Sequence, residues 1–163
     1  MLYLRKIPSL LSVLQQCKRY TVAIQELELI NTNGNTIPGK TVTQNNKYIM
    51  YYFSASWCSG CKLLLPKIKS IYTESRNRQI PLEIIYISLD DNMEEMMKGF
   101  RNNHGNWFAI PFGSPVIEEL RYRFEVAYVP FIAVLKNDGT IVTKNGKKEV
   151  EDLGINVLET WID

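Results

Sequence analysis

Two cysteines stand three positions apart in the segment Trp-Cys-Ser-Gly-Cys-Lys at residues 57–62. The segment follows an apolar run at residues 48–53, which has the composition of a buried strand, and precedes a stretch whose apolar residues recur at helical spacing. Thiols at this spacing, where a strand passes into a helix, suit reversible exchange between a dithiol and a disulfide. The pair therefore predicts redox chemistry at Cys58 and Cys61.

The two thiols should have different roles. A helix that begins near Cys58 directs backbone N–H groups and the positive end of its dipole toward that sulfur, which favours the thiolate. Cys61 follows one turn later on the same helix face, within reach of a mixed disulfide formed at Cys58. We expect Cys58 to be the nucleophile and Cys61 the resolving thiol. This chemistry requires no metal and no cofactor.

Two other uses of such a pair compete with this interpretation. Half of a tetrahedral zinc site has the same spacing, but the sequence offers only Cys17 and His104 as further cysteine or histidine ligands. A structural disulfide is disfavoured because an exposed cysteine pair at the start of a helix is poorly placed to cross-link the core. Three cysteines are too few for a secreted disulfide scaffold, so a reducing compartment fits better and we expect a cytoplasmic protein.

Length and composition predict one compact domain. The chain has 163 residues, 45% of them hydrophobic, which is enough to bury a full core. Its net charge of +2 is too small to indicate a nucleic-acid partner. No apolar run approaches the roughly 18 residues that a bilayer span requires, so we expect no membrane span.

The first 25 residues differ from the rest of the chain. They carry four basic residues and no acidic one, whereas residues 26–163 contain 15 basic and 17 acidic residues. Apolar residues in this segment recur at helical spacing, interrupted by Pro8. The segment 1–25 is therefore either an amphipathic helix that packs on the domain 26–163 or a mitochondrial presequence, which would place the protein in mitochondria. Both interpretations stay open.

Strand-like and helix-like periodicities alternate along the rest of the chain. The predicted strands lie at residues 26–30, 47–53, 82–89, 131–135 and 140–143, with a short apolar element at 107–112. The predicted helices lie at residues 58–75, 92–103, 115–124 and 150–162. An Asn-Asp-Gly turn at residues 137–139 joins the last two strands as an antiparallel hairpin. This order predicts an α/β fold with a central mixed sheet flanked by helices.

The cysteine segment, Pro66 five residues beyond Cys61, and Val129-Pro130 at the start of a later strand together resemble the thioredoxin fold. The resemblance implies that Pro130 has a cis peptide bond and lies beside the disulfide. It also implies that Val129 pairs with the extended backbone of a substrate. Trp57, directly before the first cysteine, is expected to form part of the docking surface.

Within that superfamily, the segments at residues 52–58 and 107–112 are similar to those of tryparedoxins and nucleoredoxin-like proteins. The similarity covers about residues 24–163. Sixty-eight residues separate Cys61 from Pro130, which leaves room for an extra helix and strand at residues 90–114. The chain departs from the family's usual Cys-Pro-Pro-Cys-Arg at three positions, where it has Ser59, Gly60 and Lys62.

The resemblance implies a monomeric thiol–disulfide oxidoreductase that reduces client protein disulfides, such as that of a peroxidase, and is regenerated by an upstream thiol. A redox-sensitive binding module of the nucleoredoxin type is the alternative. A peroxidase in its own right is disfavoured because it needs a peroxide-activating pocket beside a lone cysteine. Some thioredoxins carry a buried acid where this chain has Tyr52, and the sequence names no carboxylate that could deprotonate Cys61.

Overall fold

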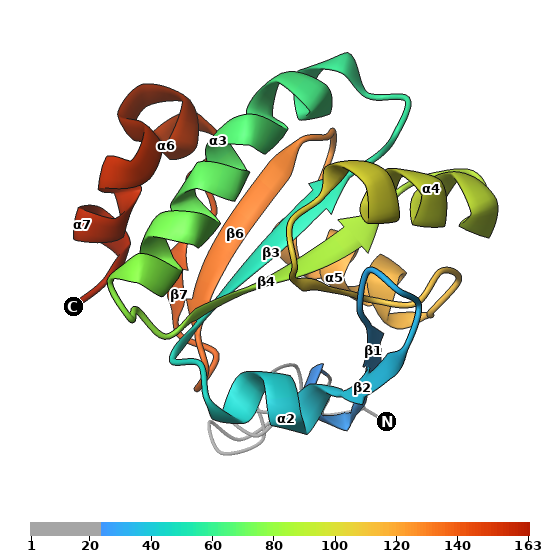
Figure 1. Cartoon of the computed structure of the whole chain (residues 1–163), viewed down its shortest axis with the longest axis horizontal. Helices are drawn as coiled ribbons and strands as arrows, with labels where there is room; N and C mark the ends of the chain where they lie inside the picture. Colours follow the sequence, from blue (N-terminus) through green and yellow to red (C-terminus); the bar gives the residue numbers. More distant parts are fainter. Residues whose placement is uncertain (1–23) are drawn as a thin grey trace, which may run out of the picture.

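The computed structural model describes residues 24–163, whose strands form one mixed seven-stranded sheet in the order β2-β1-β5-β4-β3-β6-β7 (Figure 1). The strands are β1 (Glu28–Ile30), β2 (Thr36–Pro38), β3 (Tyr48–Ser54), β4 (Leu82–Ser88), β5 (Phe108–Ala109), β6 (Phe131–Lys136) and β7 (Ile141–Thr143). The helices are α2 (Gly39–Gln44), α3 (Ser59–Asn77), α4 (Met93–Asn103), α5 (Val116–Phe124), α6 (Gly146–Leu153) and α7 (Val157–Trp161), with a 3₁₀ turn at Gly154–Asn156. The predicted fold class is confirmed.

Strands β3 and β4 form the centre of the sheet. Both are almost continuously apolar and every residue in them is buried, as expected for parallel strands that are covered on both faces. Strand β6 pairs with β3 in the antiparallel direction, from Phe53 opposite Phe131 to Tyr48 opposite Lys136. The carboxyl end of β3 therefore lies beside the amino end of β6, and this places the cysteine segment next to Val129 and Pro130.

Two apolar layers hold the helices against the sheet. Helices α3, α4, α6 and α7 contribute Leu64, Phe100, Val150 and Trp161, among others, to the core on one face. Helices α2 and α5 contribute Val42 and Phe124 to the core on the other. Figure 1 shows α3, α4 and α6 in front of the sheet and α5 behind it.

The insertion predicted at residues 90–114 is confirmed as α4 and β5. Strand β5 is short, but it pairs in parallel with β4 and antiparallel with β1, so it joins the β1–β2 hairpin to the central strands. Helix α4 covers the sheet beside α3 (Figure 1). The longer connection thus supplies a helix next to the one that carries the cysteines.

The predicted last helix, residues 150–162, is wrong in two respects. Helix α6 begins earlier, at Gly146, and the helical segment is interrupted at Gly154, whose φ of +55° lies in the left-handed region. The early start depends on a close approach to β6, since a Cβ at Gly146 would lie 2.5 Å from the Cγ2 atom of Ile132. The sequence also gave no sign of the short helix α2.

The N-terminal segment proposed at residues 1–25 lies outside the described residues except for its last two positions. Ile24 is buried against the sheet face that α2 and α5 cover. In the part of the chain that the structure describes, no helix is long and apolar enough to cross a membrane.

Candidate active site

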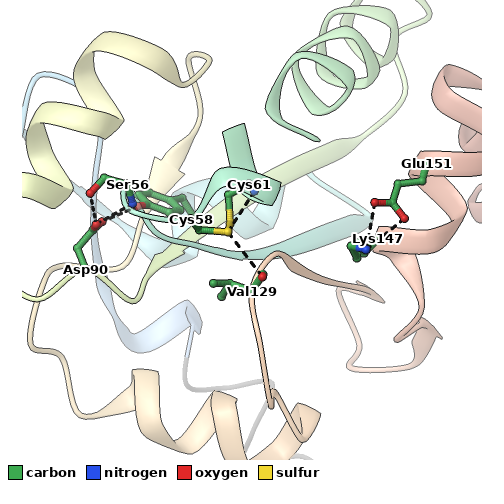
Figure 2. The surroundings of a disulfide bond; sticks show 8 residues. Ser56, Cys58, Cys61, Asp90, Val129, Lys147 and Glu151 are labelled. Atoms are coloured by element: carbon green, nitrogen blue, oxygen red, sulfur yellow. Dashed lines mark hydrogen bonds and ion pairs between the residues drawn. A yellow bond between two sulfur atoms is a disulfide. The ribbon is translucent and has the colours of Figure 1, made fainter. Parts of the chain in front are cut away.

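Cys58 and Cys61 form a disulfide at the start of α3, directly after β3 (Figure 2). Cys58 is the N-cap residue of the helix, and its Sγ accepts a hydrogen bond from the Cys61 backbone N–H at 3.1 Å. A sulfur in this position also faces the positive end of the helix dipole, which stabilises negative charge on it when the disulfide is reduced. This arrangement favours a thiolate at Cys58 over one at an unperturbed cysteine.

The two sulfurs differ in burial. Both residues are buried, with Cys58 7% exposed and Cys61 2% exposed, so Cys58 retains slightly more solvent-facing surface. An incoming disulfide can reach Cys58 more readily than Cys61. The roles of nucleophile and resolving thiol stay predictions.

Val129 and Pro130 lie directly beside the disulfide, as the resemblance implied. Their peptide bond is cis, and the carbonyl oxygen of Val129 lies 3.6 Å from the Sγ of Cys58. On the other side, a Cβ at Gly60 would lie 3.5 Å from the Cδ atom of Pro130. Figure 2 shows Val129 next to the two sulfurs. The structure thus brings together residues that are about 70 positions apart in the sequence.

Large exposed side chains surround the first cysteine. Trp57, which precedes Cys58, is 59% exposed, and Tyr128, which precedes Val129, is 70% exposed. Leu63 in the first turns of α3 is 80% exposed. Trp57 was expected to be exposed for docking, whereas Tyr128 was not singled out from the sequence. Its position next to Val129 could have suggested it.

Asp90, which the sequence analysis missed, anchors the segment before the cysteines. Its carboxylate accepts hydrogen bonds from the backbone N–H and the hydroxyl of Ser56, at 2.7 and 2.5 Å (Figure 2). It also accepts hydrogen bonds from the hydroxyls of Ser88 and Tyr86. Burial works to raise the pKa of Asp90, but these hydrogen bonds outweigh it and hold the pKa below its usual value. Asp90 is therefore a charged anchor that fixes the loop two residues before Cys58.

Tyr52 occupies the position on β3 where some thioredoxins carry an acid. It is fully buried, its hydroxyl has no hydrogen-bond partner, and burial raises its pKa to about 12. It is consequently protonated and neutral at physiological pH. Asp90, two residues beyond β4, is another acid in this region, but its oxygens already accept four hydrogen bonds.

His104 follows α4, where the sequence suggested only a polar turn. Its ring instead packs among aromatic rings, with centroid distances of 4.3 Å to Tyr86, 5.5 Å to Phe100 and 5.6 Å to Trp107. Its Nδ1 atom is buried without a hydrogen-bond partner. Burial lowers the pKa of His104 to about 4, with a smaller opposing effect from the Asp90 charge. The imidazole is therefore neutral at physiological pH.

This burial predicts a pH-dependent stability. Because the pKa of His104 in the folded protein lies below the 6.5 of an exposed histidine, its stabilising effect is complete above pH 6.5 and is lost as the pH falls toward 4. Between pH 7 and 5 the free energy of unfolding should fall by about 2 kcal/mol. Urea unfolding at several pH values measures it, and the His104→Asn variant should lack this loss. An equal loss in that variant would refute the assignment.

Among residues 24–163 the structure contains no cluster of three or more potential metal ligands. Cys17, which the zinc interpretation would need, lies outside the described residues. His104 lines the same cavity as Cys61, but Cys58 and Cys61 are joined to each other.

A cysteine pair at a helix start beside a cis-proline, on a mixed sheet of this topology, defines a dithiol/disulfide protein with a thioredoxin fold. A sequence profile of the thioredoxin-like family matches residues 45–141. The chain belongs to the thioredoxin-like family.

Individual relatives agree with this placement. Probable nucleoredoxin 1 of Arabidopsis thaliana is 30% identical over 148 residues, which cover 86% of this chain and 25% of that protein. Human nucleoredoxin-like protein 1 is 26% identical over 121 residues, which cover 71% of this chain and 57% of that protein. The chain thus spans only a quarter to somewhat over half of these relatives.

Solved structures give the same fold. The thioredoxin of Wuchereria bancrofti is 34% identical, with a TM-score of 0.74 over 85% of this chain and 96% of that one. Tryparedoxin I of Crithidia fasciculata is 22% identical, also with a TM-score of 0.74, over 90% of this chain and 97% of that one. The likeness to tryparedoxins that the sequence suggested is confirmed at the level of the fold.

Proposed function

We propose that this protein is a thiol–disulfide oxidoreductase that reduces disulfides in client proteins through Cys58 and Cys61. The observation that carries the proposal is the cysteine pair itself, in which Cys58 caps a helix and is slightly more exposed than Cys61. A disulfide with a purely structural role would not need to lie beside a cis-proline and large exposed aromatic side chains.

The reaction follows from these positions. The Cys58 thiolate attacks one sulfur of a client disulfide, forming a mixed disulfide and releasing the other client sulfur as a thiolate that takes up a proton. Cys61 then loses its proton and attacks the Sγ of Cys58. The Cys58–Cys61 disulfide forms and the second client thiol leaves, so two electrons have passed to the client. An upstream thiol reductant restores the dithiol.

The neighbourhood of Pro130 supports binding of an extended client segment. The backbone of Val129 is half-buried beside Cys58, and a hollow of about 430 Å³ continues past Pro130 toward α6. Lys147 and Glu151 in this hollow pair with each other at 3.1 Å, so it presents both charges rather than one (Figure 2). Tyr128 lines this hollow and is largely exposed. Client recognition should therefore combine backbone contacts at Val129 with polar contacts to a surface that carries both charges.

The clients we propose are proteins with accessible disulfides, including a peroxidase, and the protein acts as a monomer in a reducing compartment. Cytoplasm is the proposed location, with mitochondria as the alternative if the basic segment at residues 1–25 directs import. The proposed thiol–disulfide exchange at Cys58 is the same in either compartment.

Reduction of insulin disulfides driven by dithiothreitol tests the proposal. The protein should accelerate insulin precipitation, and Cys58→Ser should return the rate to that of dithiothreitol alone. Cys17→Ser is the matched control, because it also removes a cysteine but leaves the pair intact, and it should retain the activity. A folded protein with free Cys58 and Cys61 that gives no acceleration would contradict the proposal.

The exposed surface around Trp57 also favours a second candidate, a binding module whose association with partners depends on the state of the thiols. The Cys58→Ser, Cys61→Ser double variant distinguishes the two. A carrier loses its captured partners in this variant, since capture is covalent, whereas a binding module keeps them.

A further inference from the structure

A cavity of about 520 Å³ lies between α3 and α4, and Cys61 forms part of its wall. Its other walls come from the ends of β3 and β4, at Ser54 and Tyr86, and from Gly99 on α4. Trp57, Val129 and Pro130 do not line it, so it is separate from the surface proposed for client docking. Its volume is within the range of small-molecule sites.

The charged side chains in its wall are all positive. Lys62 and Lys69 are seven residues apart on α3 and therefore lie on the same side of the helix, while no aspartate or glutamate lines the cavity. Lys69 donates a hydrogen bond to the carbonyl oxygen of Asn103 at 3.2 Å, and neither lysine forms an ion pair among the described residues. Asp90 lies behind Ser56, where its oxygens are taken up by hydroxyl and backbone donors.

The rest of the wall is mostly apolar. Leu65 and Pro66 on α3 and the ring of Tyr86 supply apolar surface, and the ring centroid of His104 lies 4.3 Å from that of Tyr86. The Nδ1 atom of His104 is itself fully buried, so a ligand in the cavity meets this residue through the rest of its ring.

We propose that this cavity binds a small organic anion, a carboxylate or phosphate with an aromatic or aliphatic body. The anionic group lies between Lys62 and Lys69, and the body lies against Leu65, Pro66 and Tyr86 and reaches the imidazole of His104. Positive charge at the entrance and apolar surface inside complement this ligand class and disfavour a cation of the same size. A bound ligand touches the resolving cysteine without covering Cys58.

His104 makes the proposal directly measurable, because it is the only histidine in the chain and its imidazole C–H proton resonances need no assignment. We expect phenyl phosphate, titrated at pH 7 into the tag-free protein, to shift these resonances saturably with a Kd below about 10 mM. Benzylamine, which has the same ring and the opposite charge, should not shift them. No saturable shift, or equal shifts with both probes, would overturn the proposal.

Variants locate the binding site. Lys69→Gln should weaken phenyl phosphate binding about five-fold, whereas Lys67→Gln, which lies on the same helix but outside the cavity wall, should not change it. Gly99→Leu should abolish binding by filling the cavity, because a Cβ at Gly99 already lies 3.7 Å from the Cβ of Ser56. The amide spectrum of each variant confirms that it is folded. Binding that survives both Lys69→Gln and Gly99→Leu in folded protein places the anion elsewhere and refutes the site.

Discussion

Replacing Cys61 by serine should stop the reaction at the mixed disulfide, because the buried sulfur that displaces the client from Cys58 is then missing. The serine hydroxyl cannot attack a disulfide at neutral pH. The variant should therefore accumulate a covalent adduct in which each client molecule is joined to Cys58.

A chromogenic disulfide, 5,5′-dithiobis(2-nitrobenzoate), measures this outcome in the Cys17→Ser background, where Cys58 and Cys61 are the remaining cysteines. The reduced protein should release two thionitrobenzoate molecules as the disulfide closes, whereas Cys61→Ser should release one and retain the other as a mass increase. Dithiothreitol should remove the retained group.

Cys58→Ser is the matched control for this experiment. Its remaining thiol, Cys61, is only 2% exposed and should react about 100-fold more slowly. Fast labelling of Cys58→Ser together with slow labelling of Cys61→Ser would show that the roles of the two cysteines are reversed.

Asp90→Ala should lower the free energy of unfolding by about 3 kcal/mol, because it leaves the Ser56 backbone N–H and nearby buried hydroxyls without an acceptor. Asp90→Asn should cost less, since its carbonyl oxygen replaces part of the carboxylate. Asp91→Ala is the matched control: its side chain is exposed, and the change should stay within about 0.5 kcal/mol. Denaturant unfolding at pH 7 measures all three variants.

The pH dependence of the free energy of unfolding tests whether the negative charge of Asp90 is the source of this stabilisation. Because the pKa of Asp90 is depressed in the folded protein, its stabilising effect is present above the usual carboxyl pKa and is lost as the pH falls through the lower folded value. The difference between wild type and Asp90→Asn should therefore shrink below about pH 4. A loss of less than about 1 kcal/mol in Asp90→Ala at pH 7 would show that Asp90 does not anchor the loop.

The sequence predicted those parts of the fold that depend on local patterns. The continuous apolar runs of β3 and β4, the Asn-Asp-Gly turn before β7 and the cysteines after β3 are all local signals, and the structure has them within two or three residues. The helices at the end of the chain were predicted less well. The start of α6 depends on the contact of Gly146 with Ile132, which lies on β6, a strand that precedes it in the sequence. Such a contact leaves no periodicity to detect.

The same distinction applies to the site. Cys58 and Cys61 could be found from their spacing, and Val129 and Pro130 from the family resemblance. Asp90 and His104 could not, because each acquires its environment from other elements. Asp90 receives hydrogen bonds from Ser56, 34 residues earlier, and His104 is surrounded by rings from β4, α4 and the segment before β5. In the sequence, the first is one acid among several and the second stands in a run of polar residues.

Helix α4 gives the second cysteine surroundings of its own. In the proposed mechanism, clients approach Cys58 past Trp57 and Val129, whereas Cys61 borders a cavity whose far wall belongs to the inserted helix. The cysteine proposed to capture a client and the cysteine proposed to release it thus have different surroundings. Under the proposed function, we expect substitutions on α4 to change how fast a client departs while leaving the choice of client intact, so that the two halves of the catalytic cycle could evolve separately.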